Sequence, residues 1–263
     1  MLNKLLKYDL KYMIKNMSIF YILAILGSLL TRLFFSLKQT FIVGIISQIC
    51  VGFMFSMVFS ILINTIIRSW VRFKDSLYKD ESYLTHTLPV SKTEIYESRF
   101  LQTVIFTIVS FIVMIVSLFI AYYTEERWIM LKDAINKISN GFNMNTLLFI
   151  ILVIIILFLE IINSIQSGYL GIILGFRKND NKVAFSFIFG IIGYILSQSF
   201  VILSLFIVGL FNNNIMSIFK DTILLDNSTI KLISILSITI YILLIGLMNI
   251  ICTKELKKGV NVL

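Results

Sequence analysis

The sequence predicts an all-α, polytopic membrane protein, and three observations lead to that fold class. The chain is 58% hydrophobic and 14% charged, with a mean hydropathy of +0.95, whereas soluble domains average about 25% charged residues. Apolar runs of about 20 residues recur, and runs of that length need a bilayer as solvent. There is one proline in 263 residues, which favours long helices because proline interrupts helical hydrogen bonding.

Residues 1–17, MLNKLLKYDLKYMIKNM, predict an amphipathic helix that lies in the membrane interface. Four lysines spaced by three or four residues share one face, and leucines and methionines occupy the other. These lysines are Lys4, Lys7, Lys11 and Lys15. We expect them to face anionic lipid. Asp9 falls on the apolar side, so it either lies at the edge of that face or pairs with a basic group elsewhere.

Six apolar spans follow, and residues 18–263 are therefore expected to form one six-helix transmembrane domain. The spans are expected at about 18–37, 41–67, 100–123, 146–174, 183–211 and 232–252. The first apolar run is too long for a signal-peptide core, so no cleavable signal is expected.

Lysine and arginine set the orientation of a membrane protein, because they accumulate in cytoplasmic segments. With the N-terminus inside, the inner segments hold most of these residues. The outer segments then hold only Lys38, Arg127, Lys132, Lys137, Lys220 and Lys231. The bias predicts a multi-pass protein of the cell membrane with both termini, and the polar segment 68–99, in the cytosol.

The longest polar interruption, Tyr78 to Arg99, contains the only proline, Pro89, and the only histidine. We expect a short helix under the membrane, a stop at Pro89 and a second helix that enters the third span. The residue before proline disfavours helix, and Ser91 with Glu94 fits a capping box at a new helix start. An ordinary amphipathic loop is the alternative.

Three features lie inside the spans, and two of them are open to two interpretations each. Glu160 is a functional candidate because a carboxylate inside a membrane is costly, or it belongs to a polar packing surface with Asn163 and Gln166. Arg32 lies nearer the outer face than Glu160, so no direct pair between them is expected. The second span repeats small or polar residues, which favour close contact within the chain or between two copies. They are Gly44, Gln48, Gly52 and Ser56.

Two outer loops carry apolar runs, Trp128–Leu131 and Ile215–Phe219. We expect short interfacial helices there, which either cap the outer mouth of a pathway or anchor the loops through aromatic residues.

Sequence signatures of catalysis are missing from the chain. The phosphate loop G-x-x-x-x-G-K-[ST], the zinc motif H-E-x-x-H and the nucleophile elbow G-x-S-x-G do not occur in the sequence. One histidine and two membrane cysteines give no metal-ligand set. The net charge of +9 is attributed to topology rather than to nucleic-acid binding. An enzyme is therefore not expected.

Two stretches, LLKYDLK near the start and DESYLTHTLPVSKTEIYESRFL after the second span, resemble the permease subunits of type-2 ATP-binding-cassette exporters. The resemblance implies that the second stretch forms a coupling helix, which docks on a separate ATPase subunit. The residues that match this motif are Glu81, Tyr83, Leu84, Leu88, Pro89, Val90 and Ser91. It also implies a connecting helix beside the ATPase, matched by Leu5, Lys7, Tyr8, Asp9 and Lys11.

The same resemblance implies an ATP-driven exporter made of two permeases and two ATPases. The permeases would be two copies of this chain or this chain and a paralogue. ATP and magnesium would be bound by the partner ATPase, and this chain would hold no cofactor. The expected substrate is amphipathic, such as a peptide, with a role in antimicrobial resistance. Two other functions stay open: an ion-coupled carrier that uses Glu160, and a non-transporting membrane anchor or immunity protein.

Overall fold

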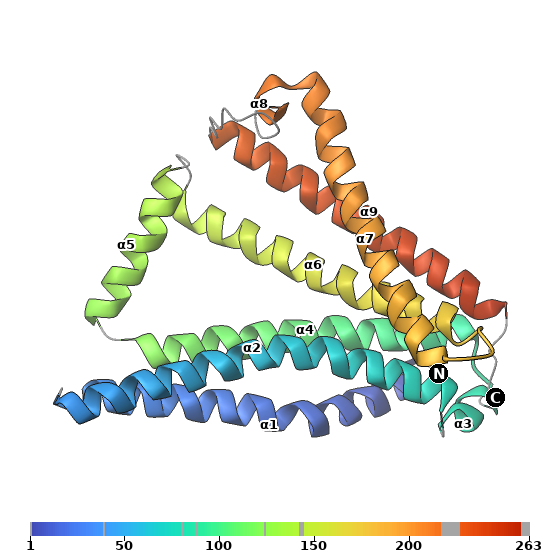
Figure 1. Cartoon of the computed structure of the whole chain (residues 1–263), viewed down its shortest axis with the longest axis horizontal. Coiled ribbons are helices and arrows are strands. Elements are labelled where there is room, and N and C mark those ends of the chain that lie inside the picture. Colours follow the sequence, from blue (N-terminus) through green and yellow to red (C-terminus); the bar gives the residue numbers. More distant parts are fainter. Residues whose placement is uncertain are drawn as a thin grey trace. The chain divides into compact units, whose positions relative to one another are not determined.

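A computed structural model of the chain describes residues 2–38, 40–79, 81–87, 89–123, 125–141, 145–216 and 227–258, and the regular structure in these ranges is helical (Figure 1). The helices are α1 (Leu2–Ser36), α2 (Phe41–Tyr78), α3 (Ser82–Thr87), α4 (Lys92–Tyr122), α5 (Glu125–Gly141), α6 (Thr146–Gly175), α7 (Lys182–Phe211), α8 (Asn213–Met216) and α9 (Asn227–Lys257). The prediction of an all-α chain is confirmed for these ranges.

Six helices, α1, α2, α4, α6, α7 and α9, are long and apolar enough to cross a membrane. In each of them, at most 33% of the most apolar 18-residue window is buried inside the protein. Large apolar side chains therefore point outward, such as Phe41 at 84% exposure, Phe59 at 66% and Phe187 at 66%. Such surfaces need lipid around them, which indicates a multi-pass membrane protein.

The structure differs from the expected boundary near residue 17. Helix α1 runs without a break from Leu2 to Ser36, so the amphipathic segment and the first span form one element. Asn16 and Ser18 are residue types that can begin a new helix, but here both side chains donate back to helix carbonyls. Asn16 Nδ2 donates to the Tyr12 oxygen at 2.8 Å and Ser18 Oγ to the Lys15 oxygen at 3.4 Å. The local polar groups therefore support continuation of the helix.

Helix α2 also extends past the expected end of the second span, from Ile67 to Tyr78. Its 38 residues correspond to about 57 Å at a rise of 1.5 Å per residue, against a hydrocarbon thickness of about 30 Å. The polar segment 68–99 is therefore largely helical rather than a loop.

The expected order of short helix, stop and new helix is confirmed around Pro89. Helix α3 ends at Thr87 and α4 begins at Lys92. Ser91 N–H donates to Glu94 Oε2 at 3.0 Å, and Glu94 N–H donates to Ser91 Oγ at 3.2 Å. These reciprocal bonds are a capping box, as the sequence predicts.

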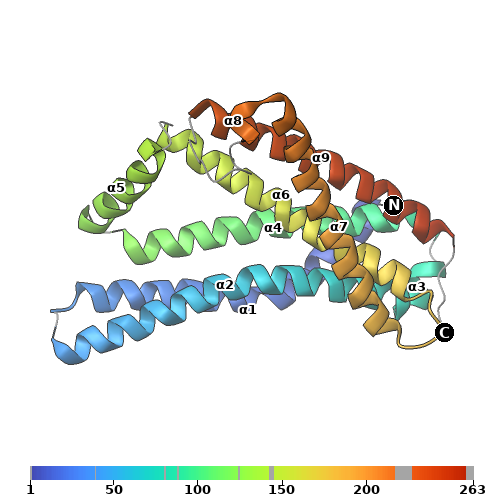
Figure 2. The ribbon, with the colours of Figure 1, turned by 45° about the horizontal axis from the view of Figure 1, so that its top comes forward.

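The chain forms two compact units, and the first consists of residues 1–72 and 97–131. In this unit, α1, α2 and α4 run alongside one another (Figures 1 and 2). Hydroxyl groups link all three helices: Ser110 Oγ on α4 lies 2.9 Å from Tyr21 Oη on α1 and 2.7 Å from Thr65 Oγ1 on α2. Buried apolar side chains fill the space near these contacts. They are Met13, Met17, Ala24, Ile61 and Phe106.

The second unit consists of residues 73–96 and 132–263, and in it α6 packs against both α7 and α9. The crossing of α6 and α7 depends on glycine. A Cβ atom added at Gly171 would lie 2.4 Å from the Ser186 carbonyl oxygen, and one at Gly175 would lie 2.3 Å from the Ser186 nitrogen. The two backbones can approach this closely only because these positions carry no side chain.

The repeat of small residues in α2 makes no such crossing within the described chain. A Cβ added at Gly44 or Gly52 would meet nothing within 4 Å, and Gln48 and Ser56 are exposed. The expected contact within the chain is therefore not found, and contact between two copies stays a prediction.

The two outer apolar runs are placed differently from each other. Trp128–Leu131 belongs to α5, a helix of 17 residues and thus longer than expected. Ile215 is fully buried in the short helix α8, whereas residues 217–219 of the second run lie outside the described residues.

Candidate functional site

Helix α3, in the segment expected to dock a partner, has one buried side and one exposed side. Ser82 and Thr85 are buried, at 4% and 7% exposure. Thr85 Oγ1 donates to the Glu81 carbonyl oxygen at 3.0 Å, which secures the first turn. Tyr83 is 75% exposed. A short helix in this arrangement presents an aromatic side chain on a fixed support.

The other residues of the expected motif surround the stop between α3 and α4. Glu81, Pro89 and Ser91 are exposed, and Val90 is half-buried. Leu88 and the side chain of Leu84 lie outside the described residues. The exposed residues of the motif are therefore accessible to a partner. The role of the two leucines in docking stays a prediction.

Aromatic side chains fix both ends of this segment within the second unit. At the end of α2, Phe73 stacks on Tyr169 of α6 with ring centroids 4.2 Å apart. At the start of α4, Tyr96 meets the Phe73 ring edge to face at 6.2 Å. All three side chains are buried to 1% exposure or less. Aromatic pairs add about 0.5–1.5 kcal/mol beyond the burial of their area.

A second aromatic contact lies at the last residue of α2. The Tyr78 ring packs on Phe176, directly after α6, with centroids 4.5 Å apart. The end of α2, four residues before α3 begins, is therefore packed directly against the residue that follows α6.

Polar contacts connect the same end of α6 to α9. Gln166 Nε2 lies 3.5 Å from the Tyr96 hydroxyl oxygen and 3.3 Å from the Ile245 carbonyl oxygen of α9. Arg177, in the turn after α6, forms an ion pair with Glu255 near the end of α9. The segment around α3 is thus linked to two of the long helices in its unit.

Asp9 in α1 lies at the centre of a buried ionic cluster in the first unit. It is 1% exposed, and its Oδ1 accepts from Arg72 Nη2 of α2 at 3.1 Å and also forms an ion pair with Arg99 of α4. Ser98 Oγ donates to Oδ2 at 2.9 Å. The Tyr12 ring lies 4.5 Å from the Arg72 guanidinium. Of the two expectations for Asp9, pairing with a basic group is the correct one.

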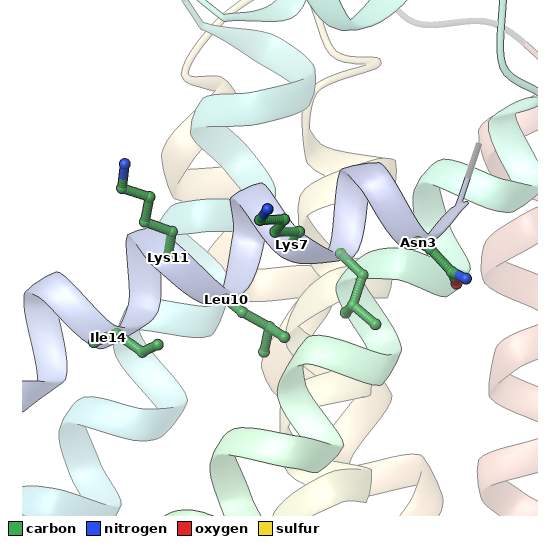
Figure 3. A pocket seen from close by; sticks show the side chains of 6 residues that line it. Asn3, Lys7, Leu10, Lys11 and Ile14 are labelled. Atoms are coloured by element: carbon green, nitrogen blue, oxygen red, sulfur yellow. The ribbon is translucent and has the colours of Figure 1, made fainter.

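Most of the remaining residues of the expected connecting helix lie on the exposed face of α1. Lys7, Tyr8 and Lys11 are exposed, with Tyr8 at 70%, and Leu5 is half-buried. A shallow groove of about 450 Å³ runs along this surface. Figure 3 shows Lys11 directed away from Leu10 and Ile14 along this groove. It is lined by Asn3, Leu6, Lys7, Leu10, Lys11 and Ile14.

Glu160 belongs to a polar cluster of α6, α7 and α9. Its Oε1 accepts from the Tyr194 hydroxyl at 2.6 Å, and Gln198 Nε2 lies 2.9 Å from Oε1 and 3.0 Å from Oε2. The Tyr241 hydroxyl of α9 donates to Gln198 Oε1 at 3.3 Å. Arg32 is an exposed residue of α1 and is not among these partners. Of the two polar candidates inside the spans, Glu160 is therefore the one that the described structure places in this polar cluster.

Several of these partners could not be identified from sequence alone. Arg72 and Arg99 are two of 23 basic residues, and no spacing distinguishes them as partners of Asp9. Tyr194 and Gln198 carry a weak signal, because they lie four residues apart and so share a face of α7. The G-x-x-x-G pattern of Gly171 and Gly175 is a stronger signal for a close helix crossing.

Taken together, these features define a class, the multi-pass helical membrane proteins, with a short exposed helix between two of its long helices. The chain matches no family model, no curated protein and no solved structure.

Proposed function

We propose that the chain is the membrane-spanning subunit of an ATP-driven exporter. A separate ATPase docks on residues 78–91, binds ATP and magnesium and performs the hydrolysis. Two ATPases act on two permeases, the second being another copy of this chain or a paralogue. The assembly lies in the cell membrane with segment 68–99 and both termini in the cytosol. This chain is a transport subunit and not an enzyme.

One observation carries this proposal most directly: α3 exposes Tyr83 while the helix ends on both sides of it are buried. Interfaces between proteins concentrate their binding energy in a few aromatic or arginine side chains. A loop with no mechanical role would have no need of the aromatic packing between Phe73, Tyr96 and Tyr169. A rigidly mounted aromatic helix suits a docking element that must also transmit force.

The contacts of the helix ends that flank α3 suggest how force would reach the membrane. Movement of the docked ATPase displaces α3, and the packed rings carry the displacement to the end of α6. Gln166 and the Arg177–Glu255 pair extend it to α9. Packed helices change between discrete arrangements rather than deforming continuously, so ATP binding would bias two states of the helices. The cargo is an amphipathic compound such as a peptide.

The test is affinity purification of the full chain in mild detergent from its native membrane. The wild type is expected to retain an ATP-binding-cassette ATPase, identified by mass spectrometry and by ATP hydrolysis in the purified sample. Tyr83→Asp places a charge in the proposed contact and is expected to reduce the recovered ATPase by about tenfold or more, as loss of a central aromatic contact does.

Tyr123→Asp provides the control, because Tyr123 is also an exposed tyrosine, at 51% against 75% for Tyr83, and it directly follows the last residue of α4. It is expected to retain the ATPase. Absence of any ATPase from the wild-type sample, or equal recovery with both variants, would contradict the proposal.

An ion-coupled carrier is the second candidate, and the Glu160 cluster is the observation that favours it. Such carriers usually contain interrupted helices around the ion site, whereas α6, α7 and α9 are continuous over their described lengths. Loss of transport in Glu160→Gln with ATPase recovery unchanged and no ATP dependence would favour the carrier. An anchor or immunity protein would transport nothing in either assay.

A further inference from the structure

The Glu160 carboxylate is held by neutral groups alone among the residues that the structure describes. Its donors are the Tyr194 hydroxyl and the Gln198 amide. The ion pairs found in the described chain involve other carboxylates, those of Asp9, Asp75 and Glu255. Within the described ranges, Glu160 therefore has no counter-charge. A carboxylate inside a membrane span normally pairs with a cation or serves a function.

The carboxylate is held in a fixed orientation. Three donor contacts are made, two on Oε1 and one on Oε2, and the neutral Tyr241 hydroxyl of α9 also acts on the carboxylate. The donors from α7 fix its orientation, so an approaching cation would meet a preorganised acceptor rather than a free side chain. Preorganisation reduces the entropy that binding must overcome.

The surroundings of the carboxylate fit a cation that carries apolar groups. Tyr194 is 37% exposed, and its ring lies next to the carboxylate because its hydroxyl bonds to it. Aromatic rings attract cations through their negative faces. Ile191, one turn before Tyr194 on the same face of α7, is 43% exposed, and Leu157, one turn before Glu160 on α6, is 50% exposed. An apolar body would lie on these side chains.

We infer that Glu160, Tyr194 and Gln198 form a binding site for an amphipathic organic cation that reaches the protein from the membrane. An anion would be repelled by the carboxylate, and a small hydrated cation would find few ligands besides the carboxylate and one hydroxyl. As a step in export, the site rests on the proposed function. Binding itself does not, because it requires neither ATP nor the partner.

The experiment measures binding of tetraphenylphosphonium to the purified full chain in lipid nanodiscs by equilibrium dialysis. Tetraphenylborate, an anion of matched size and shape, is the ligand control. The wild type is expected to bind the cation saturably and the anion only through the lipid. Glu160→Gln removes the charge and is expected to weaken cation binding by about tenfold or more, while Tyr194→Phe, which keeps the ring, weakens it less.

Asp180→Asn is the matched protein control, because it also converts a carboxylate to an amide but lies in the exposed turn between α6 and α7. It is expected to bind as the wild type does. Equal binding by Glu160→Gln that unfolds at the wild-type temperature would overturn the inference. If Glu160→Gln does not fold, the wild type alone decides: equal saturable binding of both ions, or of neither, overturns it.

The outcome is separable from the test of the proposed function. Cation binding without a recovered ATPase would leave the site in place and remove the exporter. ATPase recovery without cation binding would support the exporter and rule out the cation site.

Discussion

At the scale of single residues, Asp9 is the clearest case of a side chain whose role depends on its partners. One buried carboxylate accepts from two arginines and a serine. Taking charges out of water is costly, and an ion pair repays that cost only when its geometry and hydrogen bonds are complete. Asp9 therefore makes the burial of Arg72 and Arg99 possible.

Asp9→Asn is expected to lower the free energy of unfolding by about 3–5 kcal/mol, because two buried guanidinium groups lose their carboxylate. The measurement is unfolding of the detergent-solubilised chain followed by circular dichroism. Asp75→Asn is the control: Asp75 is 29% exposed in its pairs with Lys74 and Lys79, and its loss should cost no more than about 1 kcal/mol. Equal effects of the two substitutions would contradict the assigned role of Asp9.

At the scale of elements, the crossing of α6 and α7 depends on two glycines. Gly171 and Gly175 face the backbone of α7 at Ser186 and Gly190. Helices in a membrane lack a hydrophobic drive to associate with each other, so close packing of backbones contributes much of their attraction.

Gly171→Ala is expected to destabilise the chain by about 1–3 kcal/mol, because the new methyl group overlaps the α7 backbone. Gly44→Ala is the matched control, since a Cβ there meets nothing within 4 Å. It is expected to be neutral or to stabilise α2 by up to about 1 kcal/mol through higher helix propensity. Thermal unfolding of the two variants under one condition makes the comparison, and a more stable Gly171→Ala would show that this crossing is wrong.

Helix α1 shows a different relation between residues and elements. The sequence changes from charged to apolar near residue 17, so hydropathy suggests two separate elements. The backbone hydrogen bonding is nevertheless that of one helix from Leu2 to Ser36. Hydropathy reports the medium that each segment prefers, whereas continuity depends on local backbone partners. The two properties are independent, so the boundary could not be read from composition.

At the scale of the whole molecule, six crossings would bring both ends of the described chain to one side of the membrane. The positive-inside bias predicts that this side is the cytosol. Lys178, in the turn after α6, would then be inside, and Asp133, in α5, would be outside.

Single cysteines at these two positions test the orientation, in a chain that also carries Cys50→Ala and Cys252→Ala. Asp133→Cys is expected to react with a membrane-impermeant maleimide on intact cells, and Lys178→Cys only after permeabilisation. Both residues are exposed, so differences in reaction report sidedness rather than burial. The opposite labelling pattern would reverse the topology and place α3 away from the cytosol.

Much of the fold and part of the candidate site follow from sequence. Long apolar runs specify helices because an apolar solvent leaves backbone groups no other partners. Pro89 and the Ser91–Glu94 pair specify their own turn, because every interaction that forms it is local. The partners of Asp9 and Glu160, and the ring contacts of Phe73 and Tyr169, could not be derived in this way, because they join residues far apart in the chain.

The sequence alone determined that the chain needs a lipid environment, that it has six long apolar helices and that the helix breaks near Pro89. Each of these depends on hydropathy or on neighbouring residues. Only the tertiary structure decided that Asp9 pairs with two arginines, that α6 and α7 cross at Gly171, and that Glu160 is held by neutral groups. These depend on which helix faces lie against each other. Most outward faces here are equally apolar, so hydropathy does not distinguish between the possible pairings.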